Sequence, residues 1–178
     1  MRIHLPEDFV TMPWRNGGGL THEIARQGSA DSFVWRLSVA DVTADGPFSA
    51  FPGLTRVLTV IAGAGLVLRT PGGVIEARPL SPVRFPGDLA VHCRRIAGDV
   101  RDFNVIFDAR AVAAAVTVPA GPFEVEGRTP GQTLAFLALR GRVLAGGMAV
   151  PAGAVATGTG PLVLAEGARG VLVRLRAI

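Results

Sequence analysis

The sequence predicts an all-β protein, and three observations support that fold class. Short apolar runs rich in Val, Leu, Ile and Phe recur along the whole chain, and 23 glycines and 13 prolines separate them. Residues 33–42 alternate in polarity with a period of two, which is the pattern of a strand. With 178 residues, 49% of them hydrophobic, the chain can bury one sizeable core or two smaller fused ones. We therefore expect many short strands joined by tight turns in a sandwich or a barrel.

The strand expected at residues 33–42 carries polar side chains on one of its two faces. Arg36 and Ser38 share this face with Ala40, because side chains two residues apart point to the same side of a strand. Such a face is usually exposed in an open sheet, but it lines the lumen in a small barrel. The sequence leaves both possibilities open.

Further strands follow in quick succession. Arg56 begins an apolar run over residues 56–61 that should be a buried central strand. A Pro71-Gly72-Gly73 turn predicts a hairpin between residues 66–69 and 74–77. The remaining strands of this part are expected over residues 83–87, 89–96 and 100–107, and the last of these places Asp102 and Asn104 on one face.

We place a domain boundary near residue 110, where residues 108–115 predict a short helix or a linker. The predicted domains are therefore residues 1–110 and residues 111–178. Several landmarks recur beyond the boundary in the same order, although chance similarity in a sequence rich in Gly, Ala and Val is the alternative. The recurring pairs are Gly46-Pro47-Phe48 with Gly121-Pro122-Phe123, residues 57–63 with 134–141, Phe85-Pro86-Gly87 with Pro151-Ala152-Gly153, and Gly98 with Gly167. The second part has few polar residues at strand positions, so we expect a degenerate copy beside a functional one.

The stretch from Trp14 to Glu23 concentrates residues that an ordinary turn rarely needs. Three consecutive glycines, Gly17 to Gly19, indicate positive φ angles or a backbone that approaches another group closely. Trp14 and Asn16 add an amphipathic ring and an amide, as a pocket for a small polar ligand requires. The glycine spacing matches neither of the common phosphate-binding motifs. A ligand-binding loop and an aromatic-anchored turn between two strands both remain open.

The run Pro-Trp-Arg-Asn-Gly-Gly-Gly-x-Thr-x-Glu-Ile-Ala, from Pro13 to Ala25, resembles the opening signature of the HutD/Ves family. These are cupin-like proteins that are often associated with bacterial histidine utilisation. Residues 33–40, 46–56 and 102–105 resemble further blocks of that family in the same order. The resemblance implies a cupin-like jelly-roll β-barrel. Together with the internal repeat, it leads us to expect a bicupin whose second half, residues 111–178, is degenerate.

Cupin enzymes typically hold a metal through His and Glu ligands at fixed distances from two glycines. The position seven residues before Gly63 is Arg56, and the position three residues after Gly87 is Ala90. An arginine is a fixed cation that repels a metal ion. His92 is the one remaining candidate ligand in this region, and a single histidine does not make a site. We therefore expect no metal and no other cofactor.

The net charge of +4 does not predict nucleic-acid binding, because the arginines are scattered along the sequence. Cys93 is the single cysteine, so no internal disulfide can form and a reducing compartment is compatible. No segment has the pattern of a secretory signal or of a membrane-spanning helix. We expect a cytoplasmic protein that contacts neither nucleic acid nor membrane, with a homodimer as one option for its assembly.

The predicted function is the binding of a small carboxylated metabolite, because an arginine in a water-poor pocket suits a carboxylate. The resemblance to HutD implies a ligand of the urocanate or N-formylglutamate class and a regulatory role in histidine utilisation. The alternatives are a metal-independent isomerase or hydrolase with Asp102 or Glu23 as the base, and a scaffold for protein partners whose pocket is filled with side chains. No catalytic residue is predicted. The predicted ligand-binding residues are Trp14, Asn16, Gly17, Thr21, Glu23, Arg36, Ser38, Phe48, Arg56, Asp102 and Asn104.

Overall fold

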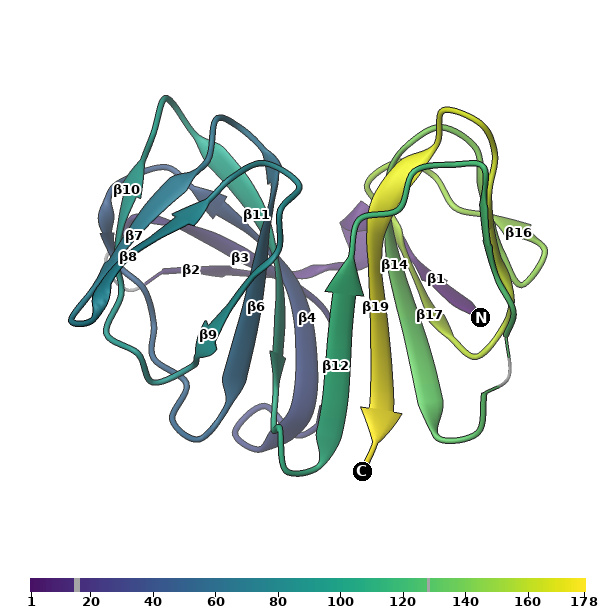
Figure 1. Cartoon of the computed structure of the whole chain (residues 1–178), viewed down its shortest axis with the longest axis horizontal. Coiled ribbons are helices and arrows are strands. Elements are labelled where there is room, and N and C mark those ends of the chain that lie inside the picture. The colour runs from purple at the N-terminus through teal and green to yellow at the C-terminus, as the bar shows by residue number, and fades with distance from the viewer. Residues whose placement is uncertain (15–16, 128) are drawn as a thin grey trace. The chain divides into compact units, whose positions relative to one another are not determined.

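The structure, a computed structural model, describes residues 1–14, 17–127 and 129–178 and divides into two compact units (Figure 1). The cavity unit consists of Val10–Ala109, and the packed unit consists of Met1–Phe9 and Arg110–Ile178. The cavity unit ends at Ala109, and the domain boundary expected from the sequence lies near residue 110. The first nine residues differ from that prediction, because strand β1 (Arg2–His4) pairs with β17 (Val155–Gly158) of the packed unit.

The described residues of the cavity unit form ten strands. They are β2 (Val10–Pro13), β3 (Gly19–Gly28), β4 (Phe33–Val42), β5 (Gly46–Pro47), β6 (Thr55–Ala62), β7 (Leu66–Thr70), β8 (Gly73–Ala77), β9 (Val83–Pro86), β10 (His92–Arg95) and β11 (Val100–Phe107). They form a six-stranded sheet in the order β2-β3-β4-β11-β6-β9 and a four-stranded sheet in the order β5-β10-β7-β8.

The packed unit is built in the same way. Its elements are β1, a 3₁₀ turn (Pro6–Asp8), β12 (Val112–Thr117), β13 (Phe123–Val125), β14 (Gln132–Arg140), β15 (Val143–Ala145), β16 (Met148–Ala149), β17, β18 (Leu162–Leu164) and β19 (Arg169–Ala177). They form a five-stranded sheet in the order β1-β17-β14-β19-β12 and a four-stranded sheet in the order β13-β18-β15-β16. The predicted all-β class is therefore confirmed. In the part of the chain that the structure describes, no helix is long and apolar enough to cross a membrane.

The segment at the predicted boundary is a strand rather than a helix or a linker. β12 alternates between buried Val112 and exposed Ala113, with the same period of two up to Thr117. It pairs with β19, and this pairing satisfies the backbone groups on one edge of β12. The high alanine content of residues 109–115 favours a helix locally, and the sheet contacts override that preference.

The two units have corresponding strands in the same order, as the predicted repeat requires, but one pair of sequence landmarks lies at different places in the two units. Gly98 precedes β11 and Gly167 precedes β19, as expected. The Pro86-Gly87 turn, however, follows β9, whereas Pro151-Ala152-Gly153 precedes β17. The shared order is what two copies of one barrel would produce, and the bicupin stays a prediction.

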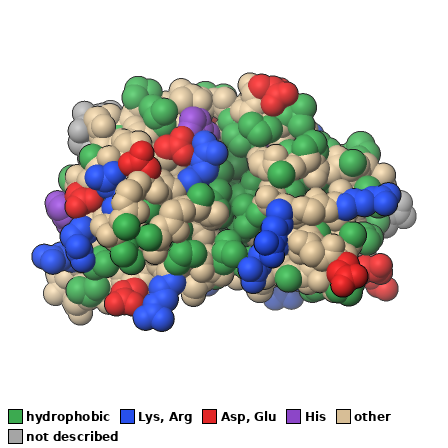
Figure 2. Space-filling view, turned by 90° about the horizontal axis from the view of Figure 1, so that it is seen from above, with side chains coloured by type: hydrophobic (Ala, Val, Ile, Leu, Met, Phe, Trp, Pro, Cys, Tyr) green, Lys and Arg blue, Asp and Glu red, His purple; other side chains and the backbone are tan. Residues whose placement is uncertain are grey.

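The two units have different interiors. The core cluster of the packed unit consists of buried apolar side chains, including Leu134, Phe136 and Leu172. The corresponding cluster of the cavity unit contains Leu58, Leu66 and other apolar residues, but that unit also buries most of the polar side chains described below. On the face shown in Figure 2, arginine and acidic side chains are scattered among one another, and no broad single-sign patch is visible among the residues drawn there.

Candidate functional site

A small cavity lies over the inner face of the six-stranded sheet in the cavity unit. Its volume is about 30 Å³, which is room for about two water-sized groups. It opens into a wider vestibule of about 550 Å³, and Trp14, Arg36 and Phe51 line both spaces. The inner cavity is lined by Trp14, Thr21, Arg36, Ser38, Ala40, Phe48, Ser49, Phe51, Arg56, Asn104 and Ile106.

Strand register brings the polar side chains together on the floor of this cavity. Arg36 of β4 is level with Ile106 of β11, and Ile106 is level with Arg56 of β6. Two residues further along β4 and β11, Ser38 is level with Asn104. Because side chains two residues apart share a face, these strands present their polar residues to the same space. The face that carries Arg36 and Ser38 is therefore the lumen face, which the sequence left open.

Arg56 begins a chain of buried hydrogen bonds. Its Nε donates to Oδ1 of Asn104 over 2.9 Å, and Nδ2 of Asn104 donates to Oδ1 of Asp102. An arginine only donates and an ionised carboxylate only accepts, so this arrangement fixes the orientation of the Asn104 amide. The second carboxylate oxygen of Asp102, Oδ2, is buried and accepts no hydrogen bond from any described residue.

Burial shifts the pKa values of Arg56 and Asp102 in opposite directions, because it disfavours the charged form of each group. Arg56 is 6% exposed and Asp102 is 0% exposed. Burial lowers the pKa of the Arg56 guanidinium while nearby Asp102 opposes that shift, and the group stays protonated at physiological pH. Burial raises the pKa of Asp102 to about 6, against the opposing effects of Arg56 and the Asn104 hydrogen bond.

Two arginines face the cavity without an acidic partner. No hydrogen bond or ion pair joins Arg36 or Arg56 to a carboxylate among the described residues, and Nε of Arg36 is buried with no acceptor there. Each guanidinium instead lies over aromatic rings. Arg56 Cζ is 4.6 Å from the centroid of the Phe48 ring, and Arg36 Cζ is 5.0 Å from that of Phe51. A contact of this kind holds the guanidinium over the aromatic ring without using its N–H groups. These N–H groups stay available to a ligand.

A β-bulge in β3 brings an arginine beside the predicted residue Glu23. The register of β3 on β4 shifts between Glu23 and Ala25, so Ile24 is the extra residue. The bulge moves Arg26 onto the lumen face of the sheet, where its Nη1 donates to Oε1 of Glu23. Glu23 is buried in this ion pair and does not line the cavity.

The glycine run forms a tight hairpin between β2 and β3. Gly17 has φ of +69°, and its N–H donates to the Trp14 carbonyl over 3.0 Å. A Cβ atom on Gly19 would lie 2.2 Å from the Asp41 carbonyl oxygen, so only glycine fits there. Both sequence explanations for the glycines are confirmed. Gly17 itself is exposed and does not line the cavity, and predicted Asn16 lies outside the described residues.

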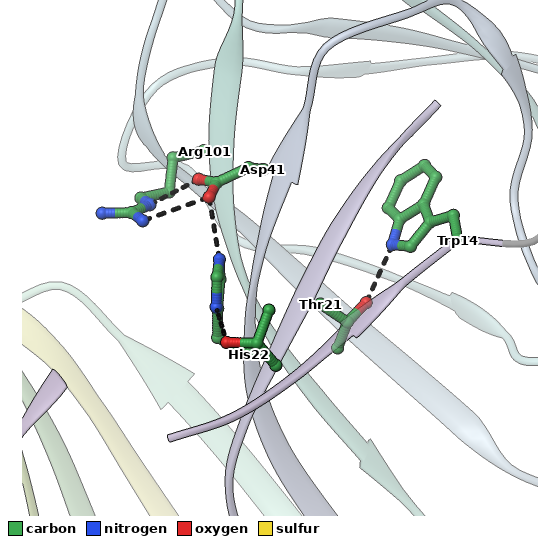
Figure 3. A network of polar contacts seen from close by, with 6 residues as sticks. Trp14, Thr21, His22, Asp41 and Arg101 are labelled. Atoms are coloured by element: carbon green, nitrogen blue, oxygen red, sulfur yellow. Dashed lines mark hydrogen bonds and ion pairs between the residues drawn. The ribbon is translucent and has the colours of Figure 1, made fainter. Parts of the chain in front are cut away.

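The hairpin also positions Trp14 at the cavity. Trp14 Nε1 donates to Oγ1 of Thr21 over 2.8 Å (Figure 3). The Trp14 ring meets the Phe48 ring edge to face, with centroids 5.7 Å apart. The sequence offered a turn and a ligand loop as alternatives. The segment is an aromatic-anchored turn, and its Trp14 and Thr21 side chains also form part of the cavity wall.

His22 points away from the cavity, because it follows Thr21 in the strand and so faces the opposite side of the sheet. Its Nε2 and Oδ2 of Asp41 are 2.8 Å apart, and its Nδ1 lies 2.8 Å from Oγ1 of Thr11 (Figure 3). Burial opposes ionisation of Asp41, but hydrogen bonds from Arg101 and His22 outweigh it and hold the pKa of Asp41 below its usual value. This network gives His22 a structural role.

The side chains at the cavity do not fit a metal ion. Among the described residues, no three of His, Cys, Asp or Glu come together in a group that could hold one. Arg56 occupies the cavity floor, and a fixed positive charge excludes a cation from that space. His92 is exposed on β10, outside the inner cavity. The residues present are suited to an anion.

The structure places most of the predicted ligand-binding residues at the inner cavity and three of them away from it. Gly17, Glu23 and Asp102 do not line the inner cavity, since Gly17 forms the turn, Glu23 pairs with Arg26, and Asp102 lies beneath Asn104. The predicted residues that do line it are Trp14, Thr21, Arg36, Ser38, Phe48, Arg56 and Asn104. Sequence reasoning missed Ala40, Ser49, Phe51 and Ile106. Extending the period of two along β4 and β11 would have found Ala40 and Ile106.

Comparison with known proteins identifies close relatives of the chain. A solved structure of HutD from Pseudomonas fluorescens SBW25 (formate condition) superimposes with a TM-score of 0.89 at 35% identity, and the match covers 99% of this chain and 98% of that one. A conserved protein of unknown function from Pseudomonas aeruginosa PAO1 matches with a TM-score of 0.83 at 34% identity, over 98% of each chain.

One curated relative and one distant fold relative add to this. An uncharacterized 21.2 kDa protein in the hutC 3′ region of Pseudomonas putida is 43% identical over 106 residues. That match covers 57% of this chain and 55% of the relative, so it spans about half of the relative's length. A cupin 2 conserved barrel domain protein from Leptotrichia buccalis has a TM-score of 0.61 at 8% identity, covering 90% of this chain and 89% of that one, and it shows the fold alone.

The predicted cupin-like fold and the resemblance to HutD are therefore confirmed. The HutD family model matches residues 6–173, which is nearly the whole chain and includes both units. The chain belongs to the HutD family.

Proposed function

We propose that this protein binds a small carboxylated metabolite in the cavity between Arg36 and Arg56 and acts as a metal-free regulatory protein of histidine utilisation. The observation that carries the proposal is the pair of cavity arginines that have no carboxylate partner among the described residues. Glu23 and Asp102 act on Arg36 and Arg56 only from a distance, without a direct contact among the described residues. A buried cation that lacks a direct counter-charge is costly to a fold. A bound anion would supply that counter-charge.

The size of the inner cavity favours a carboxylate over a larger anion. About 30 Å³ has room for about two oxygen-sized groups, as in one carboxylate, and a larger anion would extend into the vestibule. Arg56 uses Nε for Asn104, so its Nη groups remain for a ligand. The planar guanidinium group of an arginine can donate charge-assisted hydrogen bonds to both oxygens of a planar carboxylate.

The vestibule suits a short organic body behind that carboxylate. Its walls include the Trp14, Phe48 and Phe51 rings and the Met12 side chain, which contact apolar or flat groups well. Urocanate and N-formylglutamate both have a carboxylate on a short body. Membership of the HutD family and the hutC-region relative support these acids as the first candidates.

Titration calorimetry with urocanate, N-formylglutamate and formate tests the proposal. We expect at least one of these acids to bind the wild type, and Arg56→Ala to weaken that binding. Arg78→Ala is the matched control, since Arg78 is an exposed arginine paired with Glu76 outside the cavity. Analysis of the recovered acid by NMR separates a binder from an isomerase or hydrolase, because a binder returns the acid unchanged and an isomer or a hydrolysis product gives a different spectrum. A wild type that binds none of the acids, or an Arg56→Ala variant that binds like the wild type, would overturn the proposal.

A further inference from the structure

Asp102 is a buried carboxyl group without a direct contact to any cation among the described residues. Asn104 lies between it and Arg56, and accepts from the guanidinium with one end of its amide while donating to Asp102 with the other. Oδ2 of Asp102 is buried without a donor among the described residues. The charge of an ionised Asp102 is thus only partly compensated, at a distance, by Arg56.

Few other charged groups face Asp102. Arg56 on β6 stabilises its ionised form, while Asp41 on the neighbouring strand β4 opposes it. Cys93 of β10 belongs to the facing sheet, and burial followed by the charge of Asp102 raises the pKa of its thiol to about 12. The thiol is therefore neutral. Arg36 of β4 acts on Arg56 across the cavity as a second positive charge.

We propose that Asp102 takes up a proton when an anion enters the cavity, so that binding at this site is coupled to the protonation of a carboxyl group that the ligand does not touch. The inference rests on the proposed function and concerns its regulation. An anion against Arg56 would offset the positive charge that keeps Asp102 ionised, and it would add a negative charge nearby. The proton would pass from the buffer to the Asp102 carboxylate, and no other bond would form or break.

The position of Asp102 makes this coupling effective near neutral pH. Burial raises the pKa of Asp102 to about 6 before any anion is bound, so a further upward shift on binding falls in the physiological range. Because proton binding at Asp102 and anion binding in the cavity are then linked, the two pKa values of Asp102 determine how the affinity changes with pH. The affinity for the anion is constant below the pKa of the free protein and falls by at most about tenfold per pH unit above it, until the pKa of the complex is reached.

The experiment is titration calorimetry with N-formylglutamate and with formate, from about pH 5.5 to about pH 8, where the carboxyl groups of both probes stay ionised. Repeating the titrations in two buffers of different ionisation enthalpy counts the protons taken up. In the wild type we expect the Kd to rise with pH, and an uptake approaching about one proton per anion. In Asp102→Asn we expect a Kd that is independent of pH and no uptake. Glu76→Gln removes an exposed carboxylate outside the cavity and should behave like the wild type.

A second measurement needs no variant. The carboxyl carbon of Asp102, followed by NMR in the wild type, should titrate at a higher pH with saturating formate than without it. Binding with a Kd that is independent of pH, no proton uptake, or an Asp102 titration that formate leaves unchanged overturns the coupling and leaves the proposed function standing. If neither anion binds the wild type at any pH, the proposed function fails and the coupling fails with it.

Discussion

The two units share one strand order but have opposite interiors. In the cavity unit, β4-β11-β6-β9 forms the larger part of one sheet, and in the packed unit β12-β19-β14-β17 occupies the same sequence of positions. Even an irregularity recurs. The register shifts by one residue between Val60 and Ala62 of β6, and again between Ala138 and Arg140 of β14. The shared bulge aligns the two units position by position.

This alignment shows how the cavity unit differs. At the positions of Arg56 and Asn104, the packed unit has Leu134 and Leu172. At the position of Asp102 it has Gly170.

The glycine is required by close packing. A Cβ on Gly170 would lie 2.2 Å from Cζ of Phe136, so the Phe136 ring fills the space that Asp102 takes in the other unit. One backbone thus supports either a packed core or a polar cavity, and a few side chains decide which.

The largest effect is expected from placing the cavity arginine in the packed unit. Leu134→Arg puts a charge at a position that is 1% exposed, with Leu172 and Gly170 where Asn104 and Asp102 would assist it. We expect a loss of about 3 to 5 kcal/mol in the free energy of unfolding, measured by urea denaturation. Leu134→Met keeps the apolar volume and should lose less than about 1.5 kcal/mol. If the arginine were tolerated like methionine, the two interiors would be less different than the structure indicates.

The next effect concerns the stability cost of the buried carboxylate. Because burial raises the pKa of Asp102 from 3.8 to about 6, the folded state holds its proton more tightly than the unfolded state. The stability of the wild type should therefore fall as pH rises through that interval and stay low above it, by about 3 kcal/mol in all. Asp102→Asn removes this pH-dependent contribution. The free energy of unfolding of the variant, relative to that of the wild type, should therefore rise by about 3 kcal/mol between about pH 4 and about pH 8. A difference between the two proteins that does not change with pH in urea denaturation would contradict it.

A smaller effect is expected on binding when the cavity loses Arg56. Arg56→Ala removes charge-assisted hydrogen bonds worth roughly 1.5 to 3 kcal/mol, or about one to two decades in affinity for a carboxylate. Arg56→Lys should recover part of this, because an ammonium keeps the charge but lacks the bidentate fork. Titration calorimetry on both variants and the wild type measures the ratio of their Kd values. Equal affinities in Arg56→Ala and the wild type would show that the arginine belongs to the scaffold.

The smallest effect should come from the hairpin at the cavity wall. Trp14→Phe keeps an aromatic ring near Phe48 but removes the hydrogen bond to Thr21. We expect a loss of about 0.5 to 1.5 kcal/mol in stability. Thr21→Val should lose a similar amount, and the double variant should lose little more than either single one, since both remove the same bond. Fully additive losses in chemical denaturation would mean that this bond contributes little.

The sequence by itself determined the all-β class, the approximate strand positions and which polar residues share a face. These are local properties. The alternation that places Arg36 with Ser38, and Asp102 with Asn104, depends only on the two-residue period of a strand. The positive φ at Gly17 is also a local property, whereas the need for glycine at position 19 comes from the Asp41 carbonyl on the neighbouring strand.

Tertiary structure alone decided which face became the lumen and which partners its charges have. The sequence could not show that Asn104 lies between Arg56 and Asp102, or that a bulge at Ile24 joins Arg26 to Glu23. It also favoured a helix or a linker where β12 pairs with β19. Register, bulges and burial depend on contacts between residues far apart in the chain, and the local pattern carries no record of them.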